Sequence, residues 1–312
     1  MQYRSVGRSG LKVSTLSLGG WLTADQQLNR EHFQRLISIG IDYGINYIDL
    51  ADLYAQGQAE SLCGTLLQQL DRHELVIASK CFWPMSTGVN NRGLSRKHIM
   101  ESVHATLKRL NTDYLDLFFA HRFDPETPLD ETLRAIEDLI RQGKILYWGT
   151  CGWTTQQLRH IYTLSREYKA YAPIAQQAMY NLHERGIELE LIPLAKQLGM
   201  GLMTWSPLAS GVLSGKYHAN NISHLHSSRR KWMQPWLESN LQKQTQQLVD
   251  IAHDLGVKPA QLALAWVLKN PQVSSIISAV STVEQLQENV QAMELEFDDE
   301  LWQILSEIFV GY

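Results

Sequence analysis

Leu115-Asp116-Leu117-Phe118-Phe119-Ala120-His121 is a short apolar run that ends in a polar residue, and residues 129–142 follow it with helical periodicity. A buried run of this length before an amphipathic stretch is typical of a strand and helix in a parallel α/β fold. The same alternation occurs eight times along the chain. The strand-like runs are 16–19, 47–49, 75–80, 115–121, 145–149, 174–177, 201–205 and 274–278, and the helical stretches after them are 30–43, 59–70, 95–110, 129–142, 154–168, 187–198, 241–255 and 283–293.

Eight strand–helix units within roughly 250 residues favour a closed (β/α)8 TIM barrel. An open, doubly wound parallel sheet is the alternative, because the same alternation can build it. We expect a single domain over residues 1–312, since no linker or repeat divides the chain. Residues 3–13 predict an N-terminal hairpin that closes the barrel, 206–240 a long loop after the seventh strand, and 298–309 a C-terminal helix.

The charge balance excludes a general nucleic-acid binder, because 28 Lys and Arg stand against 32 Asp and Glu for a net charge of −4. No apolar run approaches the ~20 residues of a membrane-spanning helix, and no signal-type apolar core follows residues 1–5. The three cysteines, Cys63, Cys81 and Cys151, are too few and too far apart for a disulfide framework. We therefore expect a cytoplasmic protein with no membrane insertion.

Titratable residues end three consecutive strand-like runs, where barrel enzymes carry their chemistry. Asp49, Lys80 and His121 end the second, third and fourth runs, and Tyr54 follows Asp49 by five residues. Each residue alone is compatible with an ordinary structural role. Asp49 and Lys80 on neighbouring strands would nevertheless be partly buried side by side, which is costly unless they pair. The four residues together therefore predict a site at one end of the barrel.

This set suits reduction of a carbonyl group by hydride transfer, in which the carbonyl oxygen must gain a proton. The Tyr54 hydroxyl can supply that proton, and a neighbouring Lys80 ammonium would lower its ordinary pKa of about 10. Asp49 would hold Lys80 charged and oriented. A neutral His121 could donate a hydrogen bond to the carbonyl oxygen. Neither a metal nor a nucleophile–base pair is needed.

The segment Gly44-Ile45-Asn46-Tyr47-Ile48-Asp49-Leu50-Ala51-Asp52-Leu53-Tyr54, followed by Ala59-Glu60, resembles the aldo-keto reductase signature. Segments 93–99, 147–150, 203–209 and 214–217 resemble the branch that contains the voltage-gated potassium channel β subunits and their bacterial relatives. The resemblance implies a (β/α)8 barrel that binds NADP(H) without a Rossmann fold and reduces aldehydes or ketones to alcohols. It also implies that Asp49, Tyr54, Lys80 and His121 form a catalytic tetrad with Tyr54 as general acid.

The resemblance further assigns the cofactor and substrate residues. Trp21 would border both the cofactor and the substrate, and Gln177 would face the nicotinamide amide. Trp205 would stack on the nicotinamide, with Tyr180 as a second candidate for this role. The pyrophosphate would be wrapped by Ser206, Leu208, Ser210, Gly211 and Lys216, and the adenosine end would meet Ser281, Gln285, Glu288 and Asn289. The residues that bind the 2′-phosphate would be Ser281, Lys216, Arg229 and Arg230. The residues that line the substrate pocket would be Trp21, Tyr54, Trp83 and His121.

Departures from the branch bear on function. The channel β subunits typically carry Asn where this chain has His121, so the resemblance favours turnover of a small-molecule carbonyl substrate. The alternative is an NADP(H)-binding, redox-sensing regulatory subunit of a membrane channel with little turnover. Cys151-Gly152 stands where the branch often has Ser-Arg. Relatives in the resembled branch assemble as oligomers, so the resemblance implies a homo-oligomer.

Other motifs carry weaker signals. The segment 211–217 has one residue too few for a P-loop and no Ser or Thr after its Lys, and no Gly-x-Gly-x-x-Gly follows a strand. His218, His224 and His226 indicate a solvated loop more than a metal site, since no acidic or Cys cluster accompanies them. A barrel glycosidase needs two opposed carboxylates, and Asp49 is the only obvious one. Ser281 is either a phosphate contact or the N-cap of the next helix.

Overall fold

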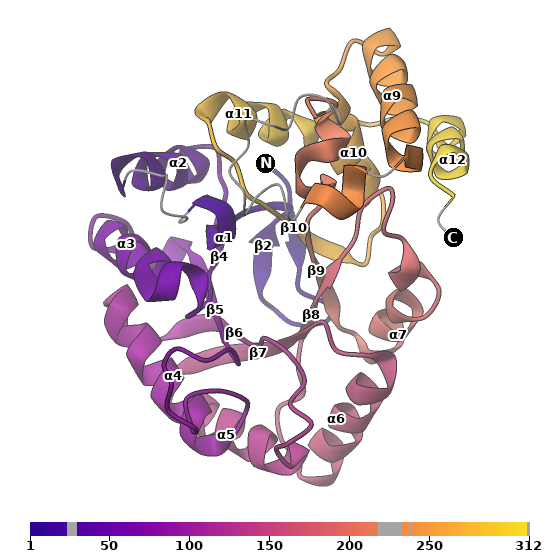
Figure 1. Ribbon diagram of the computed structural model, residues 1–312. Coiled ribbons are helices and arrows are strands. Elements are labelled where there is room, and N and C mark those ends of the chain that lie inside the picture. Colours follow the sequence, from indigo (N-terminus) through magenta and orange to yellow (C-terminus); the bar gives the residue numbers. More distant parts are fainter. Residues whose placement is uncertain (24–29, 218–232, 238, 311–312) are drawn as a thin grey trace.

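The computed structural model describes residues 1–23, 30–217, 233–237 and 239–310 (Figure 1). Its centre is a closed barrel of parallel strands in the order β10-β3-β4-β5-β6-β7-β8-β9. The strands are β3 (Leu16–Gly19), β4 (Tyr47–Asp49), β5 (Val76–Cys81), β6 (Leu115–Ala120), β7 (Ile145–Cys151), β8 (Ala175–Met179), β9 (Gly201–Trp205) and β10 (Val273–Ser278). The predicted TIM barrel is confirmed, and the open sheet is excluded because β10 pairs with β3.

Helices surround the barrel (Figure 1). They include α4, where the Ser95 hydroxyl accepts a hydrogen bond from the His98 N–H at the first turn and the left-handed Asn111 ends the helix. The helices are α1 (Gly20–Thr23), α2 (Arg30–Asp42), α3 (Gln58–Leu67), α4 (Arg96–Leu110), α5 (Leu129–Arg141), α6 (Thr155–Glu167), α7 (Leu191–Leu198), α9 (Ser239–Asp254), α10 (Pro259–Leu268), α11 (Val283–Ala292) and α12 (Asp299–Ile308). None of the described helices is long and apolar enough to cross a bilayer.

The N-terminal hairpin is present as predicted, with β1 (Tyr3–Ser5) and β2 (Lys12–Ser14) paired antiparallel. Val6 and Val13 belong to the same apolar cluster as side chains from inside the barrel. Gly7 has a left-handed φ of 57°, and a Cβ there would overlap the backbone of Gly199. The hairpin therefore closes the amino-terminal end of the barrel and leaves the other end to the functional site.

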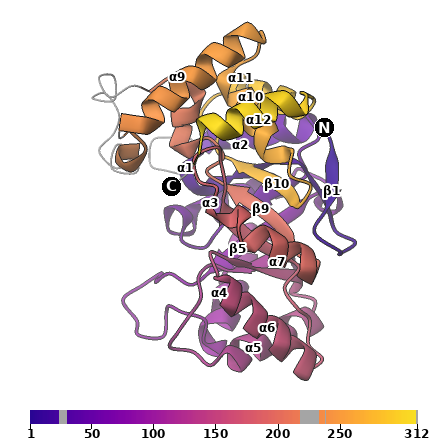
Figure 2. The same cartoon turned by 90° about the vertical axis from the view of Figure 1, so that its right-hand side faces the viewer.

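Helix α10 was not predicted from the sequence. Residues Ala260–Leu268 are all buried, so the segment shows no polar face and no helical periodicity. Its start is marked by Pro259 in the first turn and by the Lys258 N–H, which donates to Gln261 Oε1 at 2.9 Å. Figures 1 and 2 show α9, α10, α11 and α12 gathered beyond β9 and β10. α10 is the buried layer of this group.

The sequence predicts a long loop after β9, and the described parts of this segment contain short turns. Its described parts form the 3-10 turns η4 (Ala209–Ser214) and η6 (Gln234–Leu237), and α9 begins at Ser239. The predicted C-terminal helix is confirmed as α12, whose first turn is capped by the Asp298 carboxylate accepting from the Leu301 N–H at 2.9 Å.

Candidate active site

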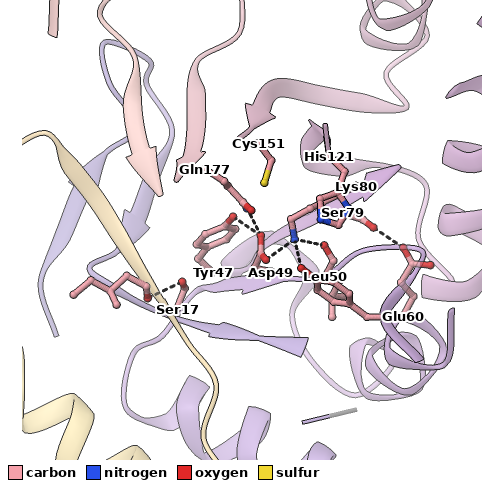
Figure 3. A network of polar contacts seen from close by, with 12 residues as sticks. Ser17, Tyr47, Asp49, Leu50, Glu60, Ser79, Lys80, His121, Cys151 and Gln177 are labelled. Carbon is pink, nitrogen blue, oxygen red and sulfur yellow. Dashed lines mark hydrogen bonds and ion pairs between the residues drawn. The ribbon is translucent and has the colours of Figure 1, made fainter. Parts of the chain in front are cut away.

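Figure 3 shows Asp49, Lys80 and His121 close together at the barrel, and Tyr54 joins them through its hydrogen bond with Lys80. Asp49 ends β4, Lys80 lies one residue before the end of β5, and His121 directly follows β6. Tyr54 begins the 3-10 turn η1 (Tyr54–Gly57), which follows β4 after four residues. All four side chains are at least nine-tenths buried. Parallel strands thus bring together residues that are up to 72 positions apart, from Asp49 to His121.

The Lys80 ammonium has an acceptor for each of its three protons. Its Nζ donates to Asp49 Oδ2 at 2.5 Å, to the Leu50 carbonyl at 2.7 Å and to the Tyr54 hydroxyl oxygen at 3.0 Å. Because the Tyr54 oxygen accepts from Lys80, the Tyr54 hydroxyl keeps its own proton for another acceptor. The geometry therefore points the tyrosine proton at a third group rather than at the lysine.

Asp49 is held on both of its oxygens. The Oδ1 atom accepts from the Tyr47 hydroxyl at 3.0 Å and from Gln177 Nε2 at 2.5 Å, while Oδ2 accepts from Lys80. Both oxygens of this buried carboxylate therefore have hydrogen-bond donors. Gln177 comes from β8 on the opposite side of the barrel, so the predicted cofactor residue is also part of the tetrad's support (Figure 3).

Burial dominates the pKa of the central tyrosine. Burial raises the pKa of Tyr54, Lys80 opposes the rise and Asp49 adds to it, and the result is about 12. Lys80 lowers this pKa as the sequence predicted, but it does not bring it below the ordinary value. Burial alone would lower the pKa of Lys80, but Asp49 and Tyr54 outweigh burial and raise it. At neutral pH the site therefore holds a protonated tyrosine beside a charged lysine.

His121 is held neutral. Burial, and then the positive charges of Lys80 and Arg122, lower the pKa of His121 to about 2. Its ring centroid lies 6.2 Å from that of Tyr54 and 6.4 Å from that of Trp83, and Trp21 lies 5.1 Å from Tyr54. Trp21 and Trp83 are 43% and 37% exposed, so the aromatic group opens to solvent. The structure brings together all four residues of the predicted substrate pocket.

The backbone after β9 forms a tight turn. Ser206, Ala209, Ser210 and Gly211 all have left-handed φ values, between 46° and 95°. Within the turn the Ala209 and Gly211 N–H groups donate to the Ser206 and Leu208 carbonyls at 3.0 and 2.8 Å. The turn is anchored by Asn181, whose Nδ2 donates to the Ser206 carbonyl at 2.9 Å. The predicted residues Leu208 and Lys216 lie within and just after this turn.

The two candidates for stacking on a nicotinamide differ in position. Trp205 is half-buried at the end of β9 and packs on the cluster inside the barrel, and its Nε1 has no hydrogen-bond partner among the described residues. Tyr180 is buried, with its ring centroid 5.2 Å from that of Trp266 and its hydroxyl donating to Glu188 Oε1 at 2.8 Å. Trp205 is therefore the more exposed of the two candidates, whereas Tyr180 is buried against Trp266 of α10.

The predicted adenosine-end residues lie around the first turns of α11. The N-cap is Thr282, whose hydroxyl accepts from the Gln285 N–H at 3.2 Å, so the N-cap interpretation of Ser281 is wrong. The Ser281 N–H donates instead to Gln285 Oε1 at 2.9 Å. Glu288 is half-buried, and Asn289 is buried with its Nδ2 donating to the Ser278 hydroxyl at 3.0 Å.

Several sequence candidates fall outside the part of the chain that the structure describes. These are Arg229, Arg230, His218, His224 and His226.

Comparison with known proteins shows which family the chain belongs to. A sequence model of the Aldo/keto reductase family matches residues 15–309, which is nearly the whole chain. The chain belongs to the aldo/keto reductase family. The resemblance drawn from residues 44–60 is thereby confirmed, together with the barrel that it implied.

The relatives of this aldo/keto reductase include three proteins named as potassium channel subunits. A probable voltage-gated potassium channel subunit beta from Arabidopsis thaliana is 41% identical over 305 residues, covering 95% of this chain and 92% of the relative. A protein of the same name from Oryza sativa subsp. japonica is 41% identical over 303 residues, with the same coverage. A putative voltage-gated potassium channel subunit beta from Schizosaccharomyces pombe is 42% identical over 309 residues, covering 96% and 89%.

An ion pair outside the barrel wall supports the tetrad of this aldo/keto reductase, and the sequence reasoning did not find it. Glu60 is fully buried, accepting from the Ser79 hydroxyl and from Arg109 Nε at 2.5 Å each. Ser79 directly precedes Lys80, and Arg109 packs beneath the left-handed Gly57 of the Tyr54 turn. The pair therefore ties the strand of the lysine to the turn of the tyrosine. Glu60 lies in the segment that resembles the family signature, and this was the one sequence signal that pointed to it.

Asp52 lies close to this pair and is also buried. Its Oδ2 accepts from the Ser102 hydroxyl at 2.9 Å, and its Oδ1 has no hydrogen-bond partner within the described residues. Burial raises the pKa of Asp52 to about 7, with the Ser102 hydrogen bond opposing the rise and Glu60 adding to it. The folded protein thus favours the protonated acid, whereas the unfolded chain releases the proton near the ordinary value of 3.8.

Asp52 is therefore expected to make stability fall with rising pH. Because the folded pKa is the higher one, the stabilisation is fully present below about pH 4 and is lost as pH rises through about 7. Asp52→Asn should remove this loss. The difference in free energy of unfolding, variant minus wild type, should be about 2–3 kcal/mol larger at pH 8 than at pH 5. Urea unfolding at both values measures it, with the exposed Asp254→Asn as control. An equal difference at the two pH values would contradict the assignment.

Proposed function

We propose that this aldo/keto reductase uses NADPH to reduce aldehyde or ketone carbonyls to alcohols. The observation that carries the proposal is the Lys80–Tyr54 hydrogen bond, in which Lys80 donates and the Tyr54 proton stays available. His121 is neutral beside it and the aromatic pocket opens to solvent. Such an arrangement suits transfer of one proton to a carbonyl oxygen.

The residues present fit a dinucleotide phosphate. Trp205 is half-buried at the end of β9 and its buried Nε1 has no hydrogen-bond partner among the described residues. We infer that the Trp205 ring lies against the nicotinamide and the tight turn at 206–211 against the pyrophosphate. When bound, the reduced nicotinamide supplies the hydride that goes to the carbonyl carbon. We propose that the cofactor is bound by Trp21, Gln177, Trp205, Ser206, Leu208, Ser210, Gly211, Lys216, Arg229, Arg230, Ser281, Gln285, Glu288 and Asn289.

The chain's own residues then handle the proton. Tyr54 donates its proton to the carbonyl oxygen as negative charge develops there. Lys80, already 3.0 Å from the tyrosine oxygen, stabilises the phenolate that remains. A neutral His121 donates one N–H to the same carbonyl oxygen and fixes its position. Asp49 keeps Lys80 charged through the whole cycle.

Oxidation of NADPH by the purified protein tests the proposal. We expect repeated turnover, followed by absorbance, on a panel of aldehydes, ketones and dicarbonyls. Tight binding of NADPH without turnover on any of these compounds would contradict the reductase. We place the reaction in the cytoplasm, and a homo-oligomer stays a prediction that light scattering tests.

The second candidate is a cofactor-sensing subunit of a membrane channel. The names of the relatives from Arabidopsis thaliana and Schizosaccharomyces pombe favour it. This candidate requires binding of NADP(H) but little chemistry, so the turnover assay also separates the two functions. His121 at the pocket favours the reductase.

The choice of NADPH over NADH depends on the 2′-phosphate. The double variant Arg229→Ala, Arg230→Ala is expected to weaken NADPH binding by about 10-fold or more, because each lost charge-assisted hydrogen bond costs roughly 1.5–3 kcal/mol. NADH lacks this phosphate and should lose much less. Titration of both cofactors by fluorescence measures the two dissociation constants. Equal losses for the two cofactors would remove these arginines from the phosphate site.

A further inference from the structure

Arg122 lies on the rim of the aromatic pocket, directly after His121. Its Nη1 donates to the His121 carbonyl at 2.7 Å and lies 3.2 Å from Cys151 Sγ. The guanidinium carbon is 5.9 Å from the centroid of the Trp83 ring. The residue is half-buried. These contacts fix one edge of the guanidinium and leave its other nitrogens for another partner.

No carboxylate among the described residues lies within 4.0 Å of Arg122. The half-buried Arg72 and Arg109 are paired with Asp116 and Glu60. The half-buried Arg4 instead donates to three backbone carbonyls, whereas Arg122 donates to one. A cation withdrawn from water without a partner is costly, and an anionic ligand removes that cost. Arg122 therefore has the environment of a residue that binds an anion.

The neighbouring strand end leaves room on this side of the guanidinium. Gly152 follows β7 with a left-handed φ of 66°, and a Cβ there would lie 3.4 Å from Arg122 Nη1. Its N–H donates to the Gln177 carbonyl at 2.9 Å, so the backbone is fixed. Arg122 thus lies near the backbone of Gly152 on one side and over the Trp83 ring on the other.

The balance of charge leaves the pocket positive. Asp49 neutralises Lys80 by direct contact, and His121 is uncharged. Arg122 is then the uncompensated charge among the described residues that surround His121. Trp21 and Trp83 supply apolar faces between this charge and the Tyr54 hydroxyl.

We propose that Arg122 binds an anionic oxo group of the substrate, a carboxylate or a phosphate, while the carbonyl of the same molecule lies at Tyr54 and His121. This inference rests on the proposed reductase function and names its substrate class. A planar or apolar spacer between the two groups packs against Trp83. Arg122 is a specificity residue, since its charge contacts a part of the substrate that does not react.

Matched aldehydes test the proposal. The wild type is expected to reduce 4-carboxybenzaldehyde with a kcat/KM about 10–100-fold above that of its neutral methyl ester, the value of one charge-assisted pair. Arg122→Met should reduce this ratio to about one, and Arg122→Lys should restore part of it. The exposed Arg92→Met serves as a matched control and should keep the wild-type ratio. 4-Formylphenyl phosphate in place of the carboxylate distinguishes the two kinds of anion.

Benzoate binding gives a readout that does not depend on turnover. Quenching of tryptophan fluorescence should report binding to wild type and a roughly 10-fold or greater loss in Arg122→Met. If the wild type reduces acid and ester equally, or if Arg122→Met binds benzoate as wild type does, the anion site is wrong while the reductase stands. If no aldehyde is reduced but benzoate binding depends on Arg122, the reductase function fails and the anion site stands.

Discussion

Replacing Tyr54 with phenylalanine is expected to lower kcat for carbonyl reduction by about 10²–10⁴-fold and to change NADPH binding little. The substitution removes the proton donor and keeps the ring, whose contact with Trp21 maintains the shape of the pocket. It also leaves one Lys80 proton without its acceptor, while Asp49 and the Leu50 carbonyl still hold the ammonium. Single-turnover mixing with preformed NADPH complex separates the chemical step from product release.

Tyr162→Phe is the matched control for this experiment. Tyr162 is half-buried, and its hydroxyl donates to the Pro173 carbonyl at 2.5 Å on the far side of α6. This variant loses a tyrosine hydroxyl without touching the tetrad and should keep wild-type kcat. Turnover retained in Tyr54→Phe would show that another group donates the proton.

Lys80→Met is expected to lower kcat by about 10²–10³-fold, because the charge that stabilises the phenolate is lost. It should also reduce the free energy of unfolding by about 3–5 kcal/mol, since Asp49 is left buried and uncompensated. Lys80 lowers the pKa of Tyr54, so its loss raises that pKa above about 12 and opposes alcohol oxidation in particular. Unfolding and steady-state rates in both directions measure these effects.

The double variant Lys80→Met, Asp49→Asn separates the two roles. Removing the buried carboxylate charge should recover most of the lost stability, whereas turnover should stay low. Recovery of turnover together with stability would show that Lys80 acts through folding alone, and would contradict its assigned effect on Tyr54.

The barrel and its central residues could be predicted because both depend on short-range patterns. Each strand is a short buried run, and parallel strands place their carboxyl ends together. Three consecutive runs, 47–49, 75–80 and 115–121, end in a titratable residue. Asp49, Lys80 and His121 followed from this rule, and Tyr54 from its short separation from Asp49. The pocket aromatics Trp21 and Trp83 came from the resemblance rather than from periodicity.

Features that depend on long-range packing could not be predicted. Helix α10 is buried on all sides and therefore lacks the amphipathic pattern that reveals a helix. The Glu60–Arg109 pair joins residues 49 positions apart on different helices. The net pKa of Tyr54 depends on how far burial outweighs a neighbouring cation, and sequence spacing carries no measure of burial.

The hydrogen bond from Gln177 to Asp49 spans 128 residues and crosses the barrel interior. Asp49 comes from β4 and Gln177 from β8, so this contact requires the strands between them to have joined the barrel. Long-range contacts of this kind are slow to form, because chain entropy must be lost before they are made. We therefore expect the orientation of Asp49 to be set late in folding. Before β8 joins the barrel, Lys80 and Tyr54 should lack the support from Gln177 and Asp49 on which the proposed proton transfer depends.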